Sequence, residues 1–267
     1  MIQETLFDSV RPSFEKQMVG IYVWNVQAAA KDRAIRQSRW LANKEDADIV
    51  VLTEIPLANS VHKEALTTFG YSCICSPPMG DRRTLIGSRV GAISELDSPI
   101  PEWTHRAPLA QVIVNDARIP ILGAYIPSRG SVEERNVAKR QAQTAVSKVL
   151  PQLAKDSMLI AGDLNVVEPE PLPQYEIFGD WEYQFYQSFA EAGFSDVFRL
   201  FSPQKKEYSW FGRSGLGYRF DHAFASGPFL RNIDNCWYDH EARSDGLSDH
   251  SGLVLTVRIP ATGVISG

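Results

Sequence analysis

The sequence predicts an α/β protein in which strands and helices form layers within one domain. A strand pattern at residues 19–26, a helix pattern at 32–43 and a second strand pattern at 48–53 form a strand–helix–strand unit. Further strand patterns, with helix patterns between them, recur to the end of the chain. With 267 residues, of which 44% are hydrophobic and 22% charged, the chain can bury a large core without disulfides.

The first half of the chain is rich in strand patterns. β-branched and aromatic residues favour strands. After the opening unit we predict a helix at 60–69, and strands at 71–76, 84–94, 109–114 and 118–126. Residues 77–83 contain two prolines, a glycine and three charged residues, which is typical of a loop.

The second half begins with a long helix pattern. Ser131 and Glu134 have capping-box spacing, so we predict a helix from there to Leu150 that ends before Pro151. A buried strand at 158–161 follows, then a proline-rich loop at 169–173. The remaining predicted elements are helices at 181–192 and 196–201, and strands at 208–211, 218–225 and 253–259.

The domain is predicted to span residues 19–260, with an N-terminal leader at 1–18 and a C-terminal tail at 261–267. The N-terminus lacks the apolar segment of a signal peptide, and no apolar run reaches the ~18 residues of a membrane span. The three cysteines form no Cys-x-x-Cys pattern, and Cys73 and Cys75 are predicted to be buried strand thiols. We therefore expect a cytoplasmic protein with no membrane partner.

The charge of the chain bears on its partners. The formal net charge is −5, whereas nucleic-acid binders commonly carry a basic surface. Neither residues 77–83 nor residues 163–180 contain a basic cluster that would clamp a duplex. A local basic cleft is still compatible with this charge, particularly where metal ions neutralise an acidic site.

The segment at 159–165, Leu-Ile-Ala-Gly-Asp-Leu-Asn, is the most informative stretch for chemistry. Residues i and i+2 of a strand point the same way, so Asp163 and Asn165 are expected side by side where a buried strand ends. The carboxylate can ligate a hard cation or accept a proton, and the amide can donate to an anionic oxygen. An Asx turn is the alternative interpretation, because Gly, Asp and Asn all favour turns.

Other polar residues end or interrupt apolar strands in the same way. Singly, each is typical of a cap or turn, but charged groups beside a core are usually paired or metal-bound. These residues are Asn25, Glu54, Asp221, Asp249 and His250.

Taken in order, these segments resemble the motifs of the endonuclease/exonuclease/phosphatase superfamily, the fold of exonuclease III-type nucleases, DNase I and inositol polyphosphate phosphatases. The resemblance runs from about residue 19 to residue 257. The matching segments are Trp24-Asn25-Val26, Leu52-Thr53-Glu54, Tyr125-Ile126-Pro127, Gly162-Asp163-Leu164-Asn165, Tyr208-Ser209-Trp210, Arg219-Phe220-Asp221 and Ser248-Asp249-His250.

The resemblance implies a four-layer α/β sandwich, with two mixed sheets face to face and helices on the outer faces. It also implies phosphoester hydrolysis that depends on Mg²⁺, with Mn²⁺ as a substitute. Glu54 would hold the cation, with Asn25 and Asp249 nearby.

The resemblance further implies roles for the remaining polar residues. Asp163 would orient or deprotonate the attacking water, and Asn165 would donate to a phosphate oxygen. His250, held by Asp221, would stabilise charge on the phosphoryl group, and Tyr125 would stabilise the leaving oxygen.

Two residues are candidates for substrate contact. Trp210 can stack on a base, and Arg129 can meet a phosphate. The alternatives are that Trp210 packs beneath the site and that Arg129 is a solvated surface residue.

We expect a nuclease that cleaves phosphodiester bonds of nucleic acid, DNA more than RNA, with no obligate protein partner. The alternative is a phosphatase or phosphodiesterase acting on a small phosphorylated metabolite or lipid headgroup, which the acidic charge favours. A catalytically inactive binding module would have lost ligands, yet every expected position is filled. The segment from Gln27 to Lys31 departs from the Asn-Gly-Leu-Arg of abasic-site endonucleases, which argues against a dedicated abasic-site role.

Overall fold

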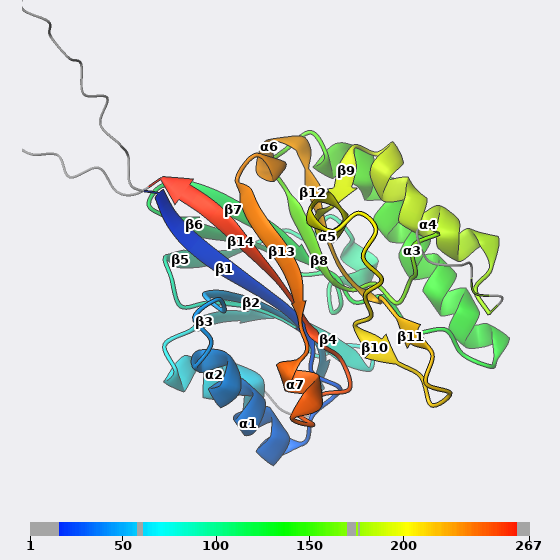
Figure 1. Cartoon of the computed structure of the whole chain (residues 1–267), viewed down its shortest axis with the longest axis horizontal. Coiled ribbons are helices and arrows are strands. Elements are labelled where there is room, and N and C mark those ends of the chain that lie inside the picture. Colours follow the sequence, from blue (N-terminus) through cyan, green and yellow to red (C-terminus); the bar gives the residue numbers. More distant parts are fainter. Residues whose placement is uncertain (1–15, 58–60, 170–174, 176, 261–267) are drawn as a thin grey trace, which may run out of the picture.

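Two six-stranded sheets packed face to face form the centre of the molecule (Figure 1). The computed structural model describes residues 16–57, 61–169, 175 and 177–260. The first sheet has the order β13 (Ile233–Asp239), β14 (Gly252–Pro260), β1 (Lys16–Asn25), β2 (Ile49–Pro56), β4 (Arg82–Ser88) and β3 (Ser72–Cys75). The second has the order β5 (Ala92–Leu96), β6 (Leu109–Val114), β7 (Ala117–Gly123), β8 (Leu159–Asp163), β12 (Asp221–Ser226) and β9 (Phe194–Asp196). A separate hairpin pairs β10 (Trp210–Phe211) with β11 (Gly217–Tyr218).

Helices cover the outer faces of both sheets (Figure 1). The long ones are α1 (Lys31–Ala42) and α2 (Val61–Thr68) on the first sheet, and α3 (Glu133–Leu153) and α4 (Asp180–Glu191) on the second. The shorter ones are η1 (Pro101–Trp103), α5 (Val197–Phe201), α6 (Gly227–Leu230) and α7 (Glu241–Ser244). The predicted four-layer α/β sandwich is therefore confirmed.

Period-two alternation in the strands explains why the layers stack in this way. In β1, Ile21 and Val23 face the second sheet, while Tyr22 and Trp24 face α1 and α2. The apolar runs of the predicted buried strands thus supply residues to both faces, because each sheet is covered on its two sides.

Both sheets are mixed, and this positions the functional residues. β1 runs parallel to β2, and β7 runs parallel to β8, while the other strand pairs are antiparallel. The carboxyl ends of parallel strands lie at the same edge, and an antiparallel neighbour contributes its beginning there. The ends of β1, β2, β7 and β8 and the beginnings of β12 and β14 therefore meet at one end of the sandwich.

Several predicted element boundaries are wrong. β1 begins at Lys16, within the predicted leader, because Lys16–Val19 pair with the last residues of β14. The strand predicted at 84–94 is two strands, β4 and β5, separated by a turn at Gly91, whose φ of +67° favours glycine. The strand predicted at 118–126 ends at Gly123, and the one at 218–225 divides between β11 and β12.

The long helix also departs from the prediction at both ends. α3 begins at Glu133 without a side-chain cap from Val132, so Ser131 forms no capping box. It continues through Pro151 to Leu153. Proline removes one helical hydrogen bond, but the burial of Leu150 and Leu153 against α4 stabilises the last turn.

The strand β13 and the short strand β9 were not predicted. β13 contains a bulge next to exposed Asp234 and Asn235, which interrupts the alternation that would reveal it. Cys73 and Cys75 lie in β3 as predicted but are only half-buried, because β3 is at the edge of its sheet. The predicted loop at 169–173 lies almost wholly outside the described residues.

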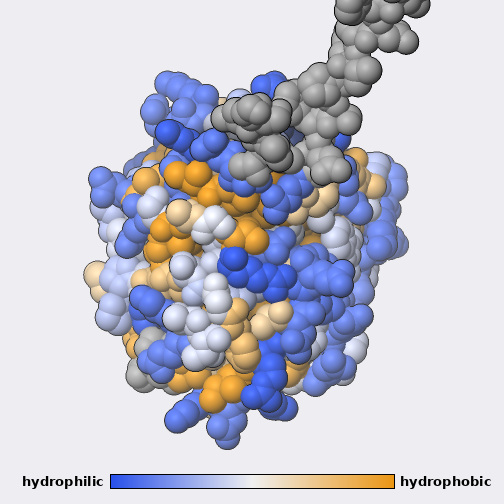
Figure 2. All heavy atoms as spheres, turned by 90° about the vertical axis from the view of Figure 1, so that its left-hand side faces the viewer, coloured by the Kyte–Doolittle hydropathy of each residue, from blue (hydrophilic) through white to orange (hydrophobic). Residues whose placement is uncertain are grey.

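The face seen in Figure 2 carries hydrophobic residues in small groups among hydrophilic ones. Within the described ranges, no helix has both the length and the apolar character needed to cross a bilayer.

Candidate active site

Polar side chains from both sheets converge at the end of the sandwich where the strand ends meet. They surround a cavity of about 600 Å³. The contributing residues include Asn25 at the end of β1, Glu54 in β2, Asp163 at the end of β8, Asp221 at the start of β12 and His250 just before β14. Residues from the first quarter of the chain to the last therefore meet in one place.

Asn25 links the two sheets. Its Nδ2 donates to Oε1 of Glu54 at 3.1 Å and to Oδ2 of Asp163 at 2.7 Å. Its Oδ1 accepts the backbone N–H of Gln27 at 2.8 Å, and its side chain is buried. The amide therefore fixes two carboxylates relative to each other.

Glu54 sits at an irregularity in β2. The pairing with β4 shifts between Leu52 and Ile55, and Glu54 has a φ of 58°. A left-handed conformation costs a non-glycine residue about 1–3 kcal/mol. The bulge turns the carboxylate toward the cavity, where Oε1 also accepts from the Tyr125 hydroxyl at 2.9 Å.

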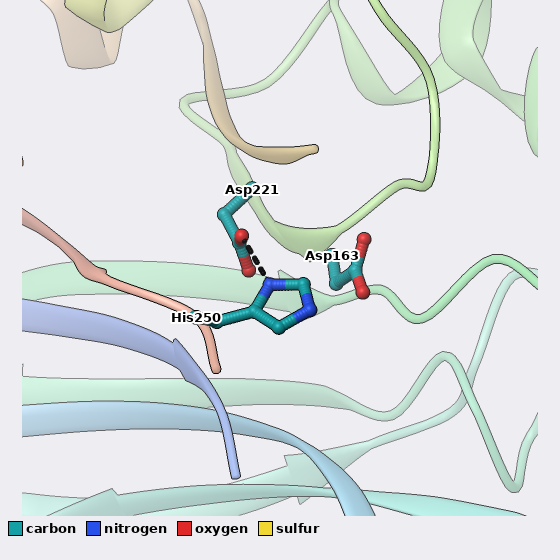
Figure 3. A group of neighbouring side chains, drawn as sticks. All are labelled: Asp163, Asp221 and His250. Atoms are coloured by element: carbon teal, nitrogen blue, oxygen red, sulfur yellow. Dashed lines mark hydrogen bonds and ion pairs between the residues drawn. The ribbon is translucent and has the colours of Figure 1, made fainter. Parts of the chain in front are cut away.

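Asp221 and His250 form a buried pair. Oδ2 of Asp221 lies 2.8 Å from Nδ1 of His250, and Figure 3 shows the imidazole between the carboxylates of Asp221 and Asp163. Burial alone would lower the pKa of His250, but the charge and hydrogen bond of Asp221, with the charges of Asp163 and Asp249, raise the pKa to about 9. His250 is therefore a cation near neutral pH, with Nε2 directed away from Asp221.

Asp163 is buried beside other carboxylates. Oδ1 accepts the backbone N–H of Asn165 at 2.9 Å. Burial raises the pKa of Asp163 to about 8, with a further contribution from the charges of Asp221 and Glu54. The buried position of Asp163 therefore disfavours its charged form.

Asn165 is pinned at the exit of β8. It has a φ of 48°, its Nδ2 donates to the Ile126 carbonyl at 2.9 Å, and its own carbonyl accepts from Lys139 at 2.6 Å. Lys139 is completely buried and also donates to Glu182, which in turn accepts from Arg129 at 2.7 Å. Arg129 is therefore a paired residue on the cavity wall, with 38% of its side chain exposed.

An aromatic wall closes one side of the cavity. Trp210, Tyr218 and Phe220 pack together, the last two with parallel rings 5.2 Å apart. Nε1 of Trp210 donates to Oδ2 of Asp249 at 2.9 Å, and the indole lines the cavity. Trp210 therefore packs on neighbouring rings and also faces the cavity.

The donor set fits a hard divalent cation. Glu54, Asp163 and Asp249 line the same cavity, and Oδ1 of Asp249 is buried with no hydrogen-bond partner among the described residues. One oxygen each of Asp163 and Asp221 and one nitrogen of His250 also lie within 4.8 Å of one another, but a protonated imidazole has no lone pair for a metal, so the ligands of the ion are the carboxylates. Mg²⁺ prefers oxygen ligands and keeps several waters, so one or two of these carboxylates suffice.

The structure brings together all the residues predicted for the site. Glu54, Arg129, Asp163, Asn165, Trp210, Asp249 and His250 line the cavity. Asn25, Tyr125 and Asp221 stand behind it, hydrogen-bonded to lining residues.

Sequence reasoning missed the buried Lys139–Glu182 pair and the wall residues Phe178, Tyr218 and Phe220. Lys139 had a signal, because its spacing of three and seven from Ala142 and Val146 puts it on the buried face of α3. Tyr218 and Phe220 also had a signal, because their i, i+2 spacing in an extended segment puts both rings on one face. Glu182 had none, since its contacts join it to Arg129 and Lys139, far away in the sequence.

The fold and the site together define a hydrolase of phosphoester bonds built on a two-sheet sandwich. The sequence model of the Endonuclease/Exonuclease/phosphatase family matches residues 22–250, so the chain belongs to that family.

Proteins that this chain resembles carry names of nucleases and of a phosphatase, as the family description does. An exodeoxyribonuclease of Bacillus subtilis is 27% identical over 154 residues, covering 52% of this chain and 60% of that protein, less than two thirds of its length. A solved AP endonuclease from Archaeoglobus fulgidus aligns with a TM-score of 0.72 and 23% identity, covering 89% of this chain and 98% of that one. A 3′ phosphatase from Neisseria bound to a product DNA hairpin aligns with a TM-score of 0.72 and 21% identity, with the same coverage. At these identities the solved structures support the fold alone.

Proposed function

We propose that the protein is a Mg²⁺-dependent nuclease that cleaves phosphodiester bonds of nucleic acid, DNA more than RNA, with Mn²⁺ as a substitute ion. The observation that carries the proposal is a single cavity with carboxylates and an imidazolium at its base and stacked aromatic rings along one wall. The first group suits a phosphate and a metal ion, and the second suits a nucleobase. The name of the Bacillus subtilis relative supports DNA as the substrate.

The proposed roles follow from the hydrogen bonds. Asp163, held by Asn25 and Asn165, orients the attacking water and accepts its proton. His250, kept protonated by Asp221, donates from Nε2 to a phosphate oxygen.

The remaining polar residues support the phosphoryl group. Asn165 uses one amide hydrogen for Ile126 and has the other for the phosphate. Tyr125 stabilises the leaving oxygen. Glu54, with Asn25 and Asp249 nearby, would hold the divalent ion, which when bound neutralises phosphate charge and activates water.

A small phosphorylated metabolite or lipid headgroup is the second candidate substrate. The net charge of −5 and the size of the cavity favour it, because about 300–1,000 Å³ is the range for small-molecule pockets. Among the lining residues that the structure describes, the lysine and arginine cations are Arg129 and Lys139, and both contact Glu182.

A substrate screen tests the proposal. We expect turnover of single-stranded or double-stranded DNA with Mg²⁺, and loss of that turnover with EDTA. Abasic DNA, RNA and small phosphoesters complete the screen. Binding of nucleic acid should weaken steeply as salt rises, whereas the KM for a small ester should change much less. Turnover of small esters alone would make the second candidate correct, and turnover that resists EDTA would exclude the metal.

Replacement of Glu54 tests the metal ligand. We expect Glu54→Gln to raise the Kd for Mg²⁺ at least about ten-fold in calorimetry, because an amide offers a neutral ligand in place of a carboxylate. The replacement keeps the shape that contacts Asn25 and Tyr125. Glu95→Gln, on the exposed strand β5, is the matched control. An unchanged Kd in Glu54→Gln would remove Glu54 from the ligand set.

A further inference from the structure

A second cavity, of about 570 Å³, lies next to the catalytic one. Glu54 and Ser128 line both cavities, and Tyr125 lines the second. A molecule whose phosphate lies at Glu54 can therefore extend from the aromatic wall on one side into this second cavity on the other. The volume of the second cavity is in the range that accommodates a small ligand or one unit of a polymer.

Three arginines from distant segments gather on the wall of the second cavity. Arg82 begins β4, Arg106 precedes β6, and Arg135 lies in the first turn of α3. The carboxylates on the same wall, besides Glu54, are Asp81 and Glu102. With Glu54 neutralised by a cation, the arginines outnumber the acids, so the cavity favours an anion.

The arginines differ in how they are held. Arg106 has its guanidinium centred 4.6 Å from the centroid of the Tyr125 ring and is ion-paired with Asp81, which fixes a cation beside the catalytic tyrosine. Its Nε and Nη1 have no hydrogen-bond partner among the described residues. Arg135 is exposed, and its side chain forms no hydrogen bond or ion pair with the described residues. Arg135 is therefore available to a ligand without loss of a hydrogen bond or ion pair.

The wall also carries an aromatic pair. The rings of Trp103 and His105 are stacked with centroids 5.7 Å apart, and both line the cavity. Aromatic rings together with arginines suit a nucleotide, because bases stack on rings and phosphates accept from guanidinium groups.

We propose that this second cavity binds the nucleotide next to the scissile phosphate, with its phosphate at Arg135 and Arg82 and its base at Trp103 and His105. The inference rests on the proposed nuclease function and deepens it, since the substrate is then a strand that spans both cavities. A single phosphorylated metabolite fills only the first cavity.

Replacement of Arg135 tests the second cavity. We compare kcat/KM for a short oligothymidylate with kcat/KM for the p-nitrophenyl ester of thymidine monophosphate, which carries one nucleoside. Arg135→Ala should lower the ratio of the two values about ten-fold, the usual weight of a charge-assisted hydrogen bond. It should also reduce the slope of log KM for the oligonucleotide against log salt by about 1, the loss of one phosphate contact.

Arg118→Ala is the matched control, because Arg118 is an exposed arginine at the beginning of β7. Tyr125 and the second cavity lie beyond the last residue of that strand. It should leave both the ratio and the salt slope as in the wild type. An Arg135→Ala variant with the wild-type ratio and slope, or one in which both substrates lose kcat/KM equally, would overturn the inference. If the wild type hydrolyses the nucleoside ester and not the oligonucleotide, the proposed nuclease function fails instead.

Discussion

Asp163→Asn is expected to lower kcat for phosphodiester hydrolysis by about two to four orders of magnitude, the usual weight of a general base. The amide keeps the shape of the carboxylate but cannot accept the proton of the attacking water. Because Asp163 also lies beside His250, the substitution removes one of the charges that stabilise the imidazolium. Single-turnover kinetics at saturating Mg²⁺ separate this loss from weaker binding of metal or substrate.

The Asp163→Asn variant should fold normally. Asp163 is buried beside Asp221 and Glu54, and its raised pKa means that its charge is disfavoured there. Removing that charge offsets the loss of one acceptor, since the carboxylate accepts from both Asn25 and Asn165. We therefore expect circular dichroism and Tm close to those of the wild type.

Asp116→Asn is the control for Asp163→Asn. Asp116 is an exposed turn residue with a φ of 65°, a conformation that asparagine adopts readily. This variant should retain wild-type kcat and Tm. Near-native turnover in Asp163→Asn would remove Asp163 from the mechanism.

The position of the candidate active site can be predicted from the sequence because its residues interrupt apolar strands. A polar residue at the end of a buried run, such as Asn25 or Asp163, is visible without any tertiary information. Parallel pairing of β1 with β2 and of β7 with β8 then places these ends at one edge. The strand patterns alone predict layers of strands and helices, whereas the two-sheet sandwich is implied by the family resemblance that the motifs carry.

Features made by contacts between distant segments are hidden from such patterns. Arg82, Arg106 and Arg135 are separate in the sequence, so neither composition nor local charge reveals that they share a cavity. For the same reason, the surroundings of Arg219 in the Arg-Phe-Asp motif cannot be predicted from the pattern of residues. Arg219 proves to be completely buried.

Arg219→Met is expected to have the largest effect on stability, lowering the free energy of unfolding by about 3–5 kcal/mol, because it leaves the buried Asp196 without a guanidinium partner and Glu168 with Arg199 alone. Arg219 donates to both oxygens of Glu168, at 3.0 and 2.8 Å, and to Asp196 at 2.6 Å. Glu168 lies in the segment after β8, and Asp196 is the last residue of β9. Arg219 joins both of them to the start of β12, because it lies two residues before Asp221. Urea unfolding in EDTA measures the change.

Arg258→Met is the matched control for Arg219→Met. Arg258 forms an ion pair with Asp234 at 3.3 Å, with 40% and 47% of the two side chains exposed. Exposed pairs of this kind contribute about 0–1 kcal/mol, so the same substitution should have little effect there. Equal losses in the two variants would show that burial of the Arg219 network is not what stabilises the fold.

The pH dependence of the Arg219→Met effect follows from the two carboxylates. Burial would raise the pKa of Asp196 and of Glu168, but the guanidinium groups of Arg219 and Arg199 and, for Asp196, the neighbouring His222 lower both pKa values below the ordinary range. A carboxyl pKa that is lower in the folded state gives stability above its unfolded value of about 4, and that stability is lost as the pH falls below it. Without Arg219 the two carboxylates no longer contribute this stability.

The difference in unfolding free energy between wild type and Arg219→Met should therefore be largest near neutral pH and shrink on acidification toward about pH 3. A difference that stays constant or grows over that range would mean that Arg219 stabilises the fold by packing rather than by its charge.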